Sequence, residues 1–184
     1  MVQAPMGFIA RAQLASAVSN AGGLGIIETS SGRLDEVREE MAAMRDLTEK
    51  PWGVNIAQLL VTDPHIVDFV AGQGVRFVTT SAGDPHRYTQ ELHDAGITVF
   101  HVVPSLRAAR KAVDAGVDGL VVEGGEGGGF KSTKPVSSMV LLPQICGAFD
   151  LPVIAAGGIV DGISMAAAFA LGAEGVQMGT RMVS

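Results

Sequence analysis

The sequence predicts a TIM barrel, in which eight parallel β-strands alternate with α-helices. The main observation is a repeated pattern: a helix ends at glycine, and a short run rich in Val, Ile or Leu follows at once. Glycine suits the left-handed conformation that ends a helix, and unbroken apolar runs suit strands that are covered on both faces. The pattern occurs at residues 20–27, 71–80, 94–102, 114–123 and 171–179.

Three further strands bring the predicted number to eight. Two apolar runs follow prolines, WGVNI at 52–56 and PVIAA at 152–156, and VQAP lies at the start of the chain. The helix and strand segments follow one another evenly, with no detectable reversal of strand order. This regularity favours a closed barrel over an open doubly wound sheet.

The segments between the strands have helical periodicity with one apolar face. Asp161 is the expected N-cap of the last helix, because a short polar side chain suits that position. The predicted apolar faces are Leu14, Ala17, Val18 and Ala21; Leu106, Ala109 and Val113; and Ile163, Ala166, Ala167 and Ala170.

The chain is short for the predicted fold. TIM barrels typically need about 250 residues, whereas this sequence has 184 residues and stops after the eighth predicted strand. We therefore expect one domain over residues 1–184, a barrel truncated after strand 8 that lacks its eighth helix and a C-terminal segment.

Composition limits the classes of function. The chain is 47% hydrophobic and 17% charged, as expected for a globular domain with a substantial core. It has no apolar run of the ~20 residues that a membrane span needs and no signal-peptide pattern, so we expect a cytoplasmic protein that does not bind membranes. A net charge of −6 without a basic cluster argues against nucleic acid. A small-molecule substrate remains, and the oligomeric state is not predicted.

Cysteine and histidine offer little for metal or nucleophilic chemistry. Cys146 lies in an apolar stretch and is expected to be a small buried side chain. His86 and His93 lie seven residues apart on one predicted helix, which is too far for a zinc pair. We expect no metal site.

Glycines mark a predicted phosphate site at the ends of strands 7 and 8. In TIM barrels the functional groups lie at the carboxyl ends of the strands, often with a phosphate site in the last two loops. AAGGI at 155–159 and MGTR at 178–181 place glycines at those ends. Backbone N–H groups there can hold a phosphate, with Thr180 adding a hydroxyl.

Other strand ends carry candidate ring-binding groups. Asn55 can form hydrogen bonds with a flat heterocycle, although an asparagine that caps a loop is more common. Met6, after Ala4 and Pro5, can cover the face of a ring or fill the barrel. The stretch EGGEGGGFKST at 123–133 is close to a phosphate-binding P-loop, but Phe130 separates the last glycine from the lysine and breaks the motif.

Taken together, these motifs resemble the nitronate monooxygenase family. The resemblance rests on QAPMG, NAGGLG, GVNI, AAGGI followed by DG, and LGAEGVQMGTR, and it covers essentially all of the chain. The family, also called 2-nitropropane dioxygenase-like, includes flavin-dependent enoyl-acyl-carrier-protein reductases. Its members are TIM barrels that bind FMN without covalent attachment. The resemblance therefore implies an FMN-dependent oxidoreductase with FMN bound in the domain formed by residues 1–184.

The resemblance also implies which residues hold FMN. The glycines after strands 7 and 8 would hold the phosphate, the first turn and Asn55 would contact the isoalloxazine ring, and the glycine loop after strand 6 would border flavin and substrate. The implied FMN contacts are Ala4, Pro5, Met6, Asn55, Gly128, Gly157, Gly158, Met178, Gly179 and Thr180.

One departure from the family pattern leaves the reaction open. Phe130 occupies the position of a histidine that acts as acid or base in several members, and phenylalanine cannot transfer a proton. His101, near a position where some members carry a lysine, is interpreted as a satisfied core or rim group. No catalytic residue is predicted.

The sequence leaves three interpretations open. The first is oxidation of a nitronate-like carbon acid with oxygen as the acceptor. The second is oxidation or reduction of an acyl-CoA or enoyl thioester, as in lipid or sterol breakdown. The third is a barrel fragment without catalytic activity. A non-flavin barrel for a sugar phosphate is less favoured, because such a site does not require QAPMG or GVNI.

Overall fold

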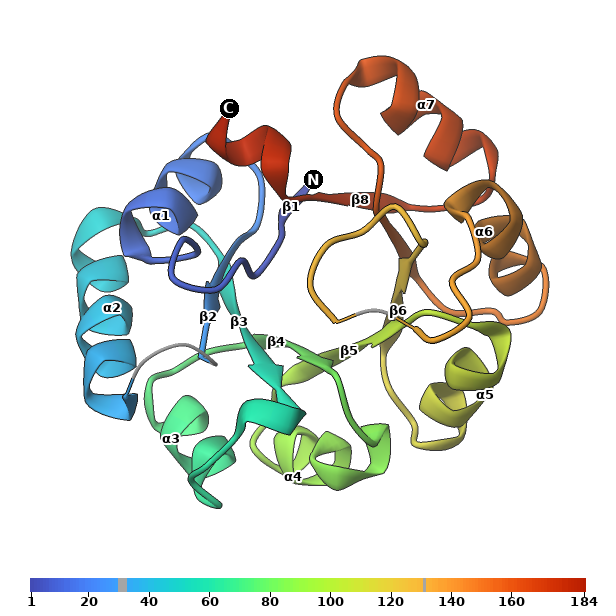
Figure 1. Ribbon diagram of the computed structural model, residues 1–184. Coiled ribbons are helices and arrows are strands. Elements are labelled where there is room, and N and C mark those ends of the chain that lie inside the picture. Colours follow the sequence, from blue (N-terminus) through green and yellow to red (C-terminus); the bar gives the residue numbers. More distant parts are fainter. Residues whose placement is uncertain (30–32, 131) are drawn as a thin grey trace.

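The chain forms a ring of eight parallel strands surrounded by helices, as the sequence predicts (Figure 1). The structure, a computed structural model, describes residues 1–29, 33–130 and 132–184. The strands are β1 (Val2–Gln3), β2 (Gly25–Glu28), β3 (Trp52–Ala57), β4 (Phe77–Ser81), β5 (Thr98–Val103), β6 (Gly119–Glu123), β7 (Val153–Ala156) and β8 (Gly175–Met178).

The first two strands close the ring. The ladder runs in the order β1-β8-β7-β6-β5-β4-β3-β2, and a parallel bridge between Val2 and Leu24 joins its two ends. The Gln3 N–H donates to the Leu24 oxygen at 3.0 Å. The Gln3 side chain supports this seam, because its amide donates to the Ile26 oxygen and accepts from the Ile26 nitrogen. All eight predicted strands are therefore confirmed.

Helices follow most strands and cover the outside of the barrel (Figure 1). The described residues also form three short 3₁₀ helices: η1 (Gln58–Leu60) and η2 (Pro85–Arg87) in connections, and η3 (Thr180–Val183) after β8. The α-helices are α1 (Ala12–Asn20), α2 (Leu34–Leu47), α3 (Ile66–Gly72), α4 (Thr89–Asp94), α5 (Leu106–Asp114), α6 (Ser138–Cys146) and α7 (Gly162–Ala170).

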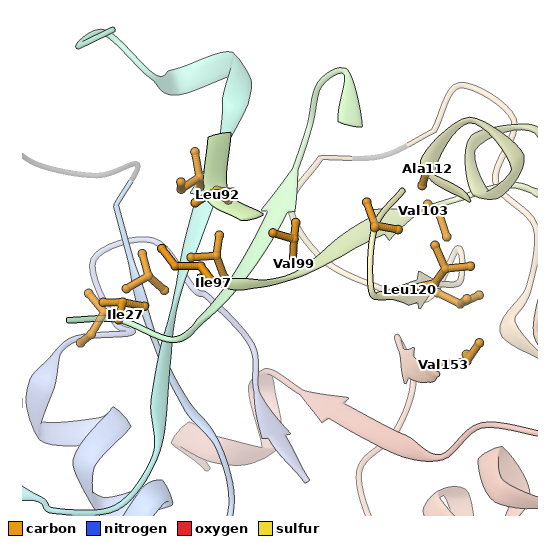
Figure 2. Packing of buried hydrophobic residues seen from close by; sticks show 14 of the residues in the cluster. Ile27, Leu92, Ile97, Val99, Val103, Ala112, Leu120 and Val153 are labelled. Carbon is orange, nitrogen blue, oxygen red and sulfur yellow. The ribbon is translucent and has the colours of Figure 1, made fainter. Parts of the chain in front are cut away.

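Alternation along the strands produces two cores. Neighbouring residues of a strand point to opposite faces, so Ile26 packs inside the barrel while Ile27 packs under the helices. Figure 2 shows part of the outer core, with Ile27, Val99 and Leu120 among its side chains. Burial of each such side chain contributes about 1.5–3 kcal/mol of transfer free energy.

Two phenylalanines fill the barrel interior and explain a glycine. The rings of Phe77 and Phe100 lie 5.2 Å apart between centroids. A Cβ added to Gly119 would lie 2.3 Å from the Phe100 ring. A Cβ added to Gly53 would likewise lie 2.8 Å from the Phe77 ring, so each phenylalanine occupies the space beside a glycine of a neighbouring strand.

The predicted helix faces have mixed outcomes. In α5, Ala109 is buried and Leu106 and Val113 pack against the core, as predicted. In α7 the N-cap is confirmed, since the Asp161 carboxylate accepts from the Ser164 N–H at 2.8 Å, but the predicted face of that helix is wrong. Ile163 is 82% exposed there. Because α7 is apolar on all sides, its periodicity does not identify the buried side.

The predicted face of α1 is also wrong, for a different reason. The buried residues of this helix are small: Ala12, Ala15, Ser16 and Ser19. The helix lies very close to β2, because a Cβ on Gly25 would stand only 2.0 Å from the Ala15 oxygen. Such a close approach requires small side chains at the contact, so the larger Leu14 and Val18 lie at its edge.

An open apolar groove lies between α7 and η3. Four methionines contribute to its lining: Met1, Met165, Met178 and Met182. Figure 1 shows both ends of the chain near this region, between α1 and α7. No α-helix within the described ranges combines the length and apolar character needed to cross a bilayer.

Candidate active site

Buried polar side chains lie near the carboxyl ends of neighbouring strands. The strand register aligns Glu28 with Asn55, and Asn55 with Thr79. All three are at most 2% exposed. Parallel strands bring their carboxyl ends to one edge, which is where barrel enzymes carry their functional groups.

Asn55 is held by the strand beside it. Its side-chain nitrogen donates to the Thr79 hydroxyl at 2.9 Å and to the Thr79 carbonyl oxygen at 3.1 Å, with Ser81 Oγ at 3.4 Å. The asparagine therefore joins β3 to β4 and does not cap a loop. These hydrogen bonds fix the orientation of the Asn55 amide.

A buried ion pair anchors the loop after β1. Arg11 Nη2 lies 3.3 Å from Glu28 Oε1, and the Phe8 N–H donates to the same oxygen at 3.3 Å. The Glu28 side chain is fully buried, so its charge depends on ion pairs and hydrogen bonds within the protein. The pair fixes the turn that contains Ala4, Pro5 and Met6 against the barrel. Sequence reasoning missed it, although a glutamate that ends an otherwise apolar strand was a visible signal.

The predicted phosphate site has glycines in conformations that favour glycine. Gly157 and Gly158 have φ angles of +92° and +75°. A Cβ on Gly157 would stand 2.9 Å from the Gly127 nitrogen, and one on Gly158 would stand 3.2 Å from Glu126 Cβ. The loops after β6 and β7 are thus in direct contact, and backbone lines the surface between them.

The loop after β8 meets the turn after β1. The Ala4 N–H donates to the Met178 oxygen at 2.8 Å, and a Cβ on Gly179 would lie 3.6 Å from both Ala4 Cβ and Met6 Sδ. The Met178 side chain belongs to the outer core, so only its backbone faces this junction. Thr180 is exposed at the start of η3. Residues predicted from the two ends of the chain therefore come together.

The loop after β6 projects toward the centre of the ring of strands (Figure 1). Gly128 is exposed there, with open space where a side chain would be. Phe130 is 53% exposed and lines a narrow crevice together with Pro104, Glu123 and Gly127. Lys131 lies outside the described residues. The Glu126 carboxylate accepts from the Ser138 N–H at 3.1 Å, so it caps α6 and is not directed at a ligand.

Gln177 is a site residue that sequence reasoning missed. It is buried on β8, aligned with Ala156 of β7, and no described residue donates to its buried Oε1 atom. A buried amide oxygen without a partner costs about 1–3 kcal/mol. The alternation of β8, with Val176 and Met178 in the outer core, directs Gln177 inward. That alternation was the signal that could have identified it.

His101 does not belong to the barrel interior. It is 4% exposed, and its Nδ1 lies 2.7 Å from the Thr80 hydroxyl. Burial lowers the pKa of His101 to about 4, so the ring is neutral at neutral pH. The interpretation of His101 as a satisfied core group is confirmed, and it supplies no positive charge to the site.

Comparisons with known proteins agree with this arrangement. A family model described as nitronate monooxygenase matches residues 1–68 and 57–184. The chain is 38% identical over 183 residues to "(3aS,4S,5R,7aS)-5-hydroxy-7a-methyl-1-oxo-octahydro-1H-indene-4-carboxyl-CoA dehydrogenase" of Rhodococcus jostii (strain RHA1), with 100% of this chain and 51% of the relative covered. It is 39% identical to the protein of the same name from Mycobacterium tuberculosis (strain ATCC 25618 / H37Rv), with 100% and 52% covered.

A solved structure shows the same fold. FabK from Thermotoga maritima superposes with a TM-score of 0.92 at 43% identity, covering 99% of this chain and 58% of that one. The chain thus spans about half the length of the curated relatives named above. Its relatives are oxidoreductases, and the matching family model extends over the whole barrel. The chain therefore belongs to the nitronate monooxygenase family.

Proposed function

We propose that this chain is the barrel of an FMN-dependent oxidoreductase that acts on an acyl-CoA thioester. The observation that carries the proposal is Phe130 at the rim of the crevice. An apolar side chain there removes the acid or base of the family pattern and favours a substrate with an apolar acyl group. The similarity to two CoA dehydrogenases over the full chain supports the same substrate class.

The residues of the barrel mouth fit FMN. The backbone surface at Gly157, Gly158 and Gly179 suits a phosphate, because N–H groups can approach it without side chains between them. The Asn55 amide suits the polar edge of a flavin ring, and so does the Gln177 Oε1 atom, to which no described residue donates. Bound FMN would supply the two-electron acceptor or donor that no side chain can provide.

Glu123 is the candidate proton acceptor. It ends β6, and its carboxylate lies over the loop, since a Cβ on Gly127 would stand 2.2 Å from Glu123 Oε1. It lines the same crevice as Phe130. In a dehydrogenation, Glu123 would take the proton from the carbon next to the thioester carbonyl, and bound FMN would supply the two-electron acceptor for the oxidation.

The absorption spectrum of the purified chain tests the cofactor first. We expect the visible bands of oxidised flavin and FMN as the released chromophore. Anaerobic addition of an acyl-CoA should then bleach these bands in the wild type, with a loss of about 10²-fold or more in rate for Glu123→Gln. A colourless protein that takes up no added FMN would overturn the flavoenzyme proposal.

The second candidate is oxidation of a nitronate with oxygen, which the match to the nitronate monooxygenase model favours. Oxygen uptake with a nitronate would distinguish the two reactions. If oxygen uptake with a nitronate is rapid and acyl-CoA does not bleach the flavin bands, the substrate is a nitronate and not a thioester.

A further inference from the structure

A group of basic side chains lies on one outer edge of the barrel. The exposed side of α5 carries Arg107, Arg110 and Lys111, and Arg87 lies nearby in η2, which contacts α5. The chain as a whole carries a net charge of −6. Arg107, Arg110 and Lys111 lie within five consecutive residues, and the fold brings Arg87 to them.

Only one of these cations is neutralised by a described carboxylate. Lys111 Nζ lies 2.8 Å from Asp84 Oδ2, and the His86 ring lies 3.1 Å from Asp84 Oδ1. The Lys111 contact and the His86 N–H lower the pKa of Asp84 to about 2, so this carboxylate stays charged.

The three arginines have other surroundings. Arg87 stacks on the Tyr88 ring, with its guanidinium carbon 4.8 Å from the ring centroid. Neither Arg107 nor Arg110 forms an ion pair within the described part of the chain.

The position of Arg107 is not explained by the stability of the helix. A cation in the first turn of a helix opposes the helix dipole, and so does an acid in the last turn. In α5, Arg107 occupies the first turn and Asp114 the last residue. Lys111 in the last turn suits the helix dipole, so only Arg107 and Asp114 oppose it. The stability of α5 therefore gives no reason for a cation at position 107.

The basic edge begins beside the crevice. Pro104 lines the crevice together with Glu123 and Phe130, and Ser105 caps α5 by accepting from the Ala108 N–H at 3.2 Å. Arg107 follows Pro104 by three residues. Figure 1 shows α5 next to β5 and β6, on the side of the barrel where the loop after β6 projects. A ligand whose reactive end lies in the crevice can therefore extend over Arg107.

We propose that this basic edge, defined as Arg87, Arg107 and Arg110, binds the phosphates of the CoA portion of the substrate. Guanidinium groups bind phosphate oxygens through paired hydrogen bonds, and CoA carries its phosphates at the end remote from the thioester. The inference rests on the proposed function, because it assumes that the substrate is a CoA ester. CoA is chosen over a carrier protein because two full-length matches of this chain are named as CoA dehydrogenases.

Calorimetric titration of the flavin-loaded chain with free CoA tests the proposal. The double variant Arg107→Gln/Arg110→Gln should bind CoA at least about 10-fold more weakly, since each lost contact to a charged group is worth roughly tenfold in affinity. The matched control is Lys50→Gln/Arg76→Gln, which removes two exposed charges just before β3 and β4, at the other end of the barrel. The control should bind CoA within about twofold of the wild type.

Pantetheine, which lacks the nucleotide phosphates, serves as the second probe. Its affinity should be the same in wild type and double variant, and raising the salt concentration should weaken CoA binding more in the wild type than in the double variant. The proposal is overturned if the wild type does not bind CoA, if the double variant binds it normally, or if the control loses as much affinity. Loss of binding to an acidic carrier protein alone, with CoA binding intact, would also overturn it.

The two proposals can fail separately. If CoA binds through the basic edge but no CoA thioester bleaches the flavin, the proposed reaction is wrong and the binding site stands. If a CoA thioester is turned over and its KM is unchanged in the double variant, the reaction stands and the basic edge is wrong.

Discussion

Gly157, at the end of β7, lies directly against Gly127 in the loop after β6. A Cβ on Gly157 would stand 2.9 Å from the Gly127 nitrogen and 3.2 Å from the Gly124 oxygen. Both contacts are with backbone atoms, which cannot rotate away as a side chain can. The two loops that border the barrel mouth are therefore held at a separation that only glycine permits at position 157.

Replacing Gly157 with alanine should separate these loops. The φ of +92° adds backbone strain, so we expect Gly157→Ala to lower the free energy of unfolding by roughly 1–3 kcal/mol. We expect the FMN content of the purified variant to fall as well. Urea unfolding and the flavin absorbance of the purified variant measure the two effects. Gly162→Ala is the control, because a Cβ at the first position of α7 meets nothing within 4 Å. Normal FMN content in Gly157→Ala would show that the contact does not shape the site.

The buried oxygen of Gln177 leads to a second prediction, in which stability and flavin affinity change in opposite directions. Leucine has a similar size and removes the buried Oε1 atom, to which no described residue donates. Gln177→Leu should therefore leave the flavin-free protein as stable as the wild type or stabilise it by about 1 kcal/mol. The same change should weaken FMN binding by roughly tenfold, because a ligand contact is lost.

Thermal unfolding without flavin and a fluorescence titration with FMN measure these two quantities. Gln144→Leu, at an exposed position of α6, should leave FMN affinity unchanged. If Gln177→Leu destabilises the flavin-free protein and leaves FMN affinity intact, Gln177 is a structural residue and not a ligand contact.

The strands could be predicted from sequence because each carries its signal locally. A glycine at a helix end and a β-branched run after it lie within ten residues, so Gly116 and the strand that begins at Gly119 are visible without any long-range information. The buried faces of α1 and α7 depend instead on what each helix packs against. The contact between Ala15 and Gly25 is a distance between two elements, and hydrophobic periodicity does not report it.

The residues of the candidate site also differ in whether their signal is local in the sequence. Glycine motifs and Asn55 could be found from sequence, because a polar or flexible residue after an apolar run is unusual. The ion pair of Arg11 and Glu28 joins residues far apart in the chain and needs the strand register. Gln177 was missed because the neighbouring Met178 and Gly179 carried the recognised motif, and only the direction of the side chains on β8 distinguishes them.

Burial of His101 predicts a stability that depends on pH. Its pKa is about 4 in the folded chain against 6.5 in the unfolded chain. Between these values the unfolded chain binds a proton that the folded chain does not, so stability is lost as pH falls from about 6.5 to about 4. Above pH 6.5 His101 is neutral in both states, so it causes no further change of stability with pH.

The full effect of His101 is about 3 kcal/mol, from 1.36 kcal/mol for each pKa unit. Urea unfolding at pH 7.5, 6 and 5 should show about 2 kcal/mol of this effect, the part lost above pH 5. It is measured as the difference between wild type and His101→Gln, because other titrating groups affect both proteins alike. A difference that stays constant over this pH range would show that His101 has the same pKa in the folded and unfolded chains and is therefore solvated.

Phe130 allows a test of what determines the reaction. The side chain is half-exposed, so Phe130→His should change the free energy of unfolding by no more than about 0.5 kcal/mol. A histidine there would restore the acid or base of the family pattern beside the barrel mouth, and such a group contributes roughly 10²–10⁴-fold in rate. We expect oxygen uptake with a nitronate to rise by at least the lower of these factors, and to fall again below a pH of about 6.5 as the imidazole is protonated.

Phe130→Gln is the control, because it adds polarity without a group that titrates in this range. Equal gains in both variants would assign the effect to polarity, and no gain in either would show that residues other than Phe130 exclude the nitronate reaction.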